Sequence, residues 1–186
     1  RTLAAALFLS LAVSFAGASE LLIDDFSEPG TSALGTQWQG FTDRVMGGRS
    51  TIEAGYLEQG DELVLAMRGE VSLANNGGFV QVRLPLAARG TFDASAYSGI
   101  ALEVRGNAGP YFIHLRTVRT RRPWQHFVAP LAVTEEWERV VVPFSAFEGD
   151  SIRGRLDTET LRSIGIVAGK EEFTANIQIR RMELVR

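Results

Sequence analysis

The chain offers few side chains that could perform covalent chemistry. It has two histidines, His114 and His126, and no cysteine. No G-x-S-x-G turn is present to carry a nucleophilic serine. The histidines are twelve residues apart on strand-like segments, whereas a zinc protease needs two histidines four residues apart on one helix. The sequence therefore predicts a protein that is not an enzyme.

Two Gly-Gly pairs are better explained as turns than as phosphate-binding loops. A P-loop needs a lysine directly after its last glycine, and neither Gly47-Gly48 nor Gly77-Gly78 is followed by one. Glycine supplies the positive φ that a tight turn between strands requires. We therefore expect a left-handed backbone at Gly77, and a turn at Gly47 that the Asp43 side chain caps.

Arginine, histidine and aromatic side chains are the strongest candidates for ligand contacts. The candidate binding residues are Arg83, Glu103, Arg105, His114, Arg116 and Trp124. Planar polar groups can hydrogen-bond sugar hydroxyls while an aromatic ring stacks on the apolar face of the sugar. The same side chains could instead form a solvated sheet face held by cross-strand ion pairs, each contributing about 0.2–1 kcal/mol. Both interpretations stay open at this point.

These candidates lie in runs with the two-residue alternation of β-strands. Strands are expected at residues 21–26, 56–71, 78–86, 100–105, 111–117, 137–142, 164–167 and 177–185. Turn-forming residues separate the runs at intervals of roughly ten residues, which is typical of a sandwich or barrel. Only residues 157–163 read as a short helical turn. The pattern predicts an all-β fold.

The alternation also predicts which way the candidate side chains point. In GFVQVRLPL (78–86) the valines and leucines share one face, which leaves Arg83 on the other. The same pattern places Glu103, Arg105, His114 and Arg116 opposite the apolar residues of their strands. If these strands are neighbours, their outward faces form one polar patch.

The first eighteen residues differ in composition from the rest of the chain. One arginine precedes an apolar run that ends in Ala16-Gly17-Ala18, the A-x-A pattern of a signal-peptide cleavage site. The run is shorter than the roughly 20 apolar residues that a membrane span needs. We expect a secretory signal at residues 1–18, a single β-sandwich domain at 19–186, and a secreted or periplasmic protein without stable membrane insertion.

Charge and composition narrow the class of partner. The formal net charge is −3, which argues against nucleic acid as the main ligand. The arginine-rich segment RTVRTRRPWQHF (116–127) suits an acidic protein or glycan equally well, or could remain solvated. No calcium-binding D-x-D-x-D-G run is present, and no cofactor is predicted.

Several longer motifs follow one another in the order of a known family. The pattern W-x-G-F-T-D-R-V-M-G-G-R-S (38–50) resembles the opening signature of the complex I intermediate-associated protein 30 family. RGEVSLANNGGFVQVR (68–83) is similar to its most recognisable stretch. Four further motifs resemble it in order: SGIALEVRGN (98–107), YFIHLRT (111–117), WQHFVAP (124–130) and WERVVVPFSAFE (137–148). Together the resemblance spans residues 21–185.

The resemblance implies a galactose-binding-domain-like β-sandwich of the jelly-roll type. Its best-known members are assembly factors for respiratory complex I and are not enzymes. It therefore implies an assembly-factor or chaperone-like role with a protein partner, and a structural corner at residues 43–50. The alternative is a carbohydrate-binding sandwich that uses its polar outward sheet face. An exposed Trp124 on a concave face would favour a glycan, whereas a large apolar patch would favour a protein.

Overall fold

The computed structural model describes residues 20–186. The predicted signal peptide and its cleavage site lie outside these residues. The described chain folds into β-strands and short 3₁₀ turns. Within residues 20–186, no helix is long and apolar enough to cross a membrane.

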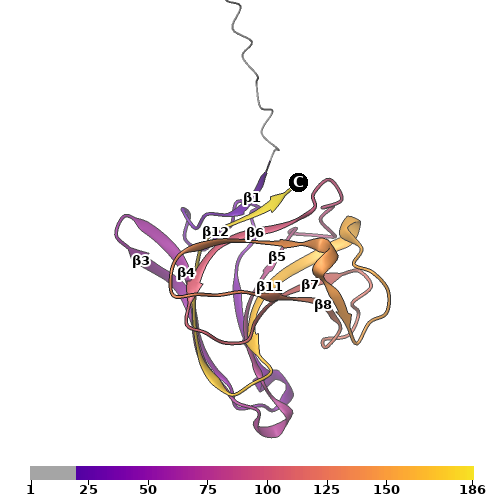
Figure 1. The fold of residues 1–186 in the computed structure, drawn as a ribbon. Coiled ribbons are helices and arrows are strands. Elements are labelled where there is room, and N and C mark those ends of the chain that lie inside the picture. Colours follow the sequence, from indigo (N-terminus) through magenta and orange to yellow (C-terminus); the bar gives the residue numbers. More distant parts are fainter. Residues whose placement is uncertain (1–19) are drawn as a thin grey trace, which may run out of the picture.

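Two antiparallel sheets pack face to face, which confirms the predicted all-β sandwich (Figure 1). Sheet A has the order β3 (Thr51–Gln59), β4 (Glu62–Val71), β12 (Phe173–Val185), β6 (Gly99–Gly106), β9 (Glu138–Pro143), and β1 (Leu21–Asp24) pairs with β12. Sheet B has the order β10 (Glu148–Asp150), β8 (His126–Leu131), β7 (Tyr111–Thr117), β11 (Leu161–Gly169), β5 (Phe79–Pro85), β2 (Gln39–Thr42).

The core lies between the sheets and follows the predicted alternation. In β5 the apolar side chains Val80, Val82 and Leu84 are at most 1% exposed, while the residues between them are half-buried. In β7 the same holds for Ile113 and Leu115, both fully buried. Because successive strand residues point to opposite faces, the polar residues of both strands must lie on the outer face of sheet B.

Several strand boundaries differ from the prediction. The predicted run at 56–71 is a hairpin, because Gly60 with φ +62° turns the chain between β3 and β4. β2 and β10 were not predicted, β8 was recognised only as a strand-like segment at His126, and β11 and β12 begin earlier than predicted. The predicted helical turn at 157–163 is a 3₁₀ turn at Thr158–Thr160 (η4), which the Asp157 side chain caps.

Asp43 joins two corners of the sandwich. It begins the 3₁₀ turn η1 (Asp43–Met46) and is fully buried. Its carboxylate accepts hydrogen bonds from the Ser50 N–H at 3.0 Å, the Ser50 hydroxyl, and the Gly78 N–H at 2.7 Å. Burial alone would raise the pKa of Asp43, but these hydrogen bonds outweigh it and lower the pKa. The side chain therefore holds the turn at Gly47 from within, as the sequence predicts.

The expected left-handed backbone at Gly77 is wrong. Gly77 is extended, with φ −76°, and the left-handed residues are Asn75 and Asn76 of η2 (Ala74–Asn76), with Gly78 at φ +133°. A side chain is excluded at Gly77 for a different reason: a Cβ there would lie 2.3 Å from an Asp43 carboxylate oxygen. The remaining 3₁₀ turn, η3 (Phe144–Ala146), follows β9.

Candidate functional site

The predicted site residues divide between the two sheets. Arg83 lies on β5, and His114 and Arg116 lie on β7, all in sheet B. Glu103 and Arg105 lie on β6 of sheet A. The expectation of one continuous patch is therefore wrong, because β6 and β7 are consecutive in sequence but belong to opposite sheets.

The outer face of sheet B carries a small polar hollow. It is lined by Gln81, Arg83, His114, Arg116, Pro123, His126, Ser163 and Gly165. Its volume of about 30 Å³ suits a water molecule or one ligand oxygen rather than a whole sugar ring. A larger ligand would lie across the face and place a single group in the hollow.

A glycine in the central strand opens this hollow. Gly165 of β11 stands opposite both Arg83 of β5 and His114 of β7 in the strand register. A Cβ at Gly165 would lie 3.2 Å from the Gln81 side-chain oxygen and 3.8 Å from the His114 Cβ. Because glycine has no side chain, the polar groups of the two flanking strands face one another across β11.

The two arginines of the hollow have different surroundings. Arg83 lies over the Phe41 ring, 4.2 Å from its centroid, and burial lowers the pKa of its guanidinium. Arg116 donates to the backbone carbonyls of Thr120, Arg122 and Pro123 at 2.8–3.1 Å. Arg116 therefore anchors the β7–β8 loop, while Arg83 has no comparable partner in the described chain.

The two histidines stack on each other at the base of the face. Their ring centroids are 3.8 Å apart and their planes differ by 14°. Burial, and then the charges of His126, Lys170 and Arg116, lower the pKa of His114 to about 3. His114 is therefore neutral at physiological pH. Among residues 20–186, its Nε2 is the one buried side-chain polar atom without a hydrogen-bond partner.

The second histidine is held by the loop and by the edge strand. His126 Nδ1 lies 3.0 Å from the Trp124 carbonyl oxygen, and its Nε2 lies 3.6 Å from Asp150. Burial lowers the pKa of His126, although Asp150 opposes the shift. His126 was not among the predicted site residues.

Most aromatic rings on this face lie beneath cations. Arg83 covers Phe41, and the Lys170 ammonium lies 4.5 Å from the centroid of Phe112. Arg122 likewise lies over Trp124, 5.6 Å from its ring centroid, but Trp124 remains 53% exposed. Trp124 is therefore the aromatic side chain of this region with the most surface open to a ligand.

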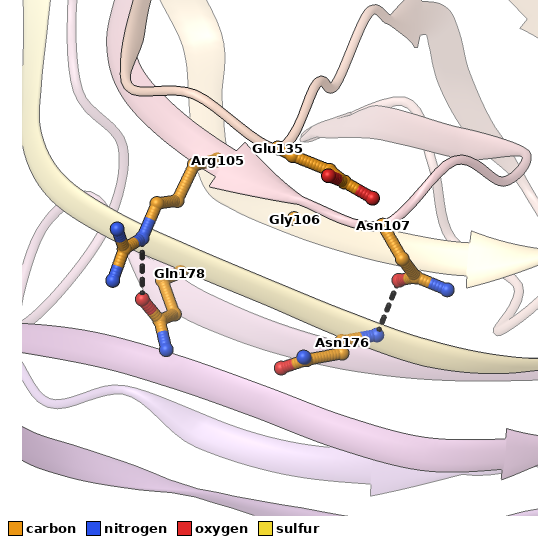
Figure 2. Close-up of a pocket in the computed structure, with 6 residues that line it drawn as sticks. All are labelled: Arg105, Gly106, Asn107, Glu135, Asn176 and Gln178. Carbon is orange, nitrogen blue, oxygen red and sulfur yellow. Dashed lines mark hydrogen bonds between the residues drawn. The ribbon is translucent and has the colours of Figure 1, made fainter.

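The outer face of sheet A also carries charges, but they are paired. Figure 2 shows Arg105 donating to Gln178 at 2.9 Å across a groove of about 280 Å³. Arg105 also donates to Gln59 at 3.0 Å and lies 4.9 Å from the Trp137 ring centroid. Glu103 accepts from Arg180 at 2.5 Å. Both predicted site residues on this sheet thus have partners within the protein.

The arrangement on sheet B can bind a hydroxyl-bearing or anionic group. It presents cations, amide groups and neutral imidazoles around a shallow hollow. Within the described residues, no group of three or more histidines or carboxylates could hold a metal ion. Sequence reasoning missed Gln81, Ser163, Gly165 and Lys170, although the alternation in β5 placed Gln81 on the same face as Arg83.

Three comparisons place the fold among known proteins. The structure is similar to a family 11 carbohydrate-binding module of a cellulosomal cellulase of Clostridium thermocellum, with a TM-score of 0.71, 15% identity, and coverage of 90% of this chain and 95% of that one. It is also similar to that organism's family 11 module in complex with a β-1,3-1,4-mixed-linked tetrasaccharide (TM-score 0.68, 13% identity, coverage 89% and 95%). A family 30 carbohydrate-binding module gives a TM-score of 0.60 at 13% identity, with coverage of 90% and 88%.

These identities show the fold alone. A comparison with curated protein sequences found no match. The family model described as complex I intermediate-associated protein 30 matches residues 25–179, which is most of the chain. The structural similarity and the family match agree with each other and with the motifs in the sequence. The chain has a galactose-binding-like sandwich fold and belongs to the complex I intermediate-associated protein 30 family.

Proposed function

We propose that this chain is a non-catalytic, exported binding protein that takes its ligand on the outer face of sheet B. The observation that carries the proposal is the charge on that face. Arg83, Arg116, Arg162 and Lys170 have no carboxylate of residues 20–186 within 4 Å. Clustered cations repel one another unless water or an oxygen-rich ligand surrounds them. The gathering of these cations on one face supports a ligand site there.

A glycan is the ligand class that the geometry of this face favours. The hollow offers side chains that can hydrogen-bond a hydroxyl, and the exposed Trp124 directly follows Pro123, which lines the hollow. This combination of planar polar groups and one exposed aromatic side chain suits sugar rings. The similarity to carbohydrate-binding modules, one of them in complex with a tetrasaccharide, supports the same class.

Affinity electrophoresis against a panel of soluble neutral and acidic polysaccharides tests this proposal. At least one polysaccharide should retard the wild-type chain, and Arg83→Ala or Trp124→Ala should restore free migration. Arg68→Ala is the matched control, because Arg68 is an exposed arginine on sheet A. Equal migration of wild type and variants on every polysaccharide would overturn the glycan assignment.

A protein partner is the second candidate, and a separate corner favours it. Val45, Met46 and Leu73 are exposed by 73%, 53% and 46%. They lie on or beside η1 and η2, which the Asn75–Gly47 hydrogen bond and the Asp43 carboxylate hold together. A rigid apolar corner suits a protein contact, in keeping with the assembly-associated family.

A purified partner would separate the two candidates. Val45→Glu with Met46→Glu should abolish co-purification of a protein partner, whereas Arg83→Ala should leave it intact. If Arg83→Ala removes the partner and the corner variant does not, the protein binds through sheet B and the corner assignment fails.

The exported location rests on the predicted signal at residues 1–18. Intact-mass measurement of the protein recovered from the native periplasm or medium should give a chain beginning near Ser19. A mass that still includes residues 1–18, recovered with membranes, would contradict this part of the proposal.

A further inference from the structure

We infer that the ligand of the sheet B face is an acidic polysaccharide whose carboxylates contact the basic side chains there. This inference deepens the proposed function and rests on it. It concerns the chemical class of the glycan, which the fold does not indicate. Charge distribution, loop structure and the covering of the aromatic rings each point to it.

Charge is unevenly distributed over residues 20–186. The basic side consists of β5, β7, β8, β10 and β11, the loops β7–β8 and β10–β11, and the turn at residues 170–172. These segments contain nine basic residues (Arg83, Arg116, Arg119, Arg121, Arg122, Arg153, Arg155, Arg162 and Lys170) and six acidic ones (Glu148, Asp150, Asp157, Glu159, Glu171 and Glu172). The rest of residues 20–186 holds nine basic and sixteen acidic residues. A polyanion would be attracted to this side and repelled by the other.

Two arginine-rich loops extend the basic face beyond the hollow. The β7–β8 loop and the β10–β11 loop lie side by side, because Arg119 donates to the Arg153 carbonyl at 2.6 Å and to the Arg155 carbonyl at 3.3 Å. Gln125 donates to the Ser151 carbonyl at 3.2 Å. Residues of both loops line an open groove of about 540 Å³.

The hollow and the groove are parts of one surface. Arg116 reaches from the hollow to three carbonyls of the β7–β8 loop, and the same loop forms one wall of the groove through Arg119 and Gln125. Arg121, Arg122 and Arg153 are exposed along it. A polymer with repeated charges could contact both parts at once, whereas a small anion would occupy only one.

The aromatic rings argue for an anionic sugar over a neutral one. A neutral glycan gains much of its affinity by stacking on open rings, but Arg83 and Lys170 cover Phe41 and Phe112. Packing on a ring also fixes a guanidinium in place, and its planar donors then match a carboxylate in two hydrogen bonds. On the outer face of sheet B, positioned cations therefore cover ring surface that a neutral sugar would stack on.

Two other polyanions fit less well. Single-stranded nucleic acid is held by bases stacked on several aromatic rings, and Trp124 is the one large aromatic exposed on this side of the described chain. An acidic protein segment would normally bring apolar anchors, and this side offers only Val118 and Trp124 as exposed large apolar residues. The inferred ligand is therefore a glycan that bears carboxylates.

Calorimetric titration with polygalacturonate and with a neutral mixed-linked β-glucan of similar length tests the inference. Polygalacturonate should bind and the neutral glucan should bind at least ten-fold more weakly. Arg83→Gln should weaken polygalacturonate binding by roughly ten-fold or more, the loss of one charge-assisted contact. Raising the salt concentration should weaken wild-type binding more than binding by Arg83→Gln. Arg68→Gln on sheet A should match the wild type.

Each other result has a defined meaning. Tighter binding of the neutral glucan, still lost in Trp124→Ala, would overturn the acidic ligand and leave the glycan proposal standing. Tighter binding of polyglutamate or of single-stranded DNA than of polygalacturonate would overturn the acidic-glycan inference. Binding of none of these probes, nor of any polysaccharide in the panel, would overturn both proposals. Should Arg83→Gln fail to fold, the Arg162→Gln, Lys170→Gln double variant replaces it with the same expected losses.

Discussion

The outer faces of the two sheets have similar side chains and opposite organisation. On sheet A, Arg105 and Glu103 each have a partner on a neighbouring strand. On sheet B, Arg83 lies over a ring with no carboxylate of the described chain nearby. The difference teaches that outward direction and charge do not by themselves mark a binding site. What distinguishes the two faces is whether neighbouring strands supply hydrogen-bond partners: Arg105 has two glutamines and Glu103 has Arg180, whereas Arg83 has neither an amide nor a carboxylate partner in the described chain.

Among single substitutions at neutral pH, the largest expected loss of stability in this comparison is at the paired end of sheet A. Glu183 is almost buried and accepts hydrogen bonds from Arg181 at 2.6 Å and Arg139 at 3.5 Å. Glu183→Ala would take the carboxylate away from the half-exposed Arg181 guanidinium, whereas Arg139 would keep its ion pair with Glu20 at 2.7 Å. We expect a loss of about 2–3 kcal/mol in the free energy of unfolding, measured by urea denaturation. A loss below about 0.5 kcal/mol would mean that the pairing on sheet A is as unimportant as ordinary surface ion pairs.

Sheet B should respond to acid through its histidine stack. The pKa of His114 is about 3 in the folded protein, against 6.5 ordinarily. Between these values the unfolded chain binds a proton that the folded chain does not. Stability should therefore be highest above pH 6.5 and fall as the pH drops toward 3, by up to about 1.4 kcal/mol per pH unit from this residue.

His114→Phe isolates that effect, because a flat ring remains without a titrating group. Urea denaturation at a series of pH values should give a shallower slope for His114→Phe than for the wild type. The slope that remains would come from His126, whose pKa burial also lowers, and from carboxylates at lower pH. Identical slopes in the two proteins would show that His114 is not held neutral by its surroundings.

A smaller effect is expected at Arg105 of sheet A. Its guanidinium donates to Gln178 and Gln59 and covers Trp137. Arg105→Ala should lower the free energy of unfolding by about 1 kcal/mol, the net contribution of hydrogen bonds of this kind. Polysaccharide binding should be unchanged. Loss of binding with unchanged stability would move the ligand site to the groove on sheet A and reverse the comparison.

The smallest stability effect is expected at Arg83 of sheet B. No carboxylate is lost with its guanidinium, and its neighbour Arg116 would feel less repulsion. Thermal unfolding of Arg83→Ala should differ from the wild type by no more than about 0.5 kcal/mol, in either direction. Destabilisation equal to that of Arg105→Ala would show that the two faces are structurally alike.

The strands themselves were largely predictable, because apolar and polar residues alternate along them. The β7 bounds match the prediction, and Val80, Val82 and Leu84 are buried as expected. The short edge strands β2 and β10 were missed because four or fewer residues contain too few alternations to detect. The predicted jelly-roll sandwich is present.

The site was predicted only in part, and the reason is the non-local pairing of strands. Nothing in the local sequence indicates that β6 joins β12 and β9, while β7 joins β11 and β8. His114 and Arg116 were therefore grouped with Glu103 and Arg105 although they occupy opposite sheets. The role of Gly165 in opening the hollow could not be predicted either, because it depends on which strands lie beside β11.

The position of β12 has a consequence for how the molecule is made. This strand pairs with β4, with β6 and with β1, and so forms the middle of sheet A. The earlier strands β1, β4 and β6 therefore cannot form their hydrogen bonds to β12 until residues 173–185 are present. A polypeptide emerging gradually from a ribosome or a translocation channel would reach its native topology only after nearly all of the sequence shown had emerged. Folds that depend on such long-range strand pairing form slowly. Until β12 has emerged, sheet A stays incomplete.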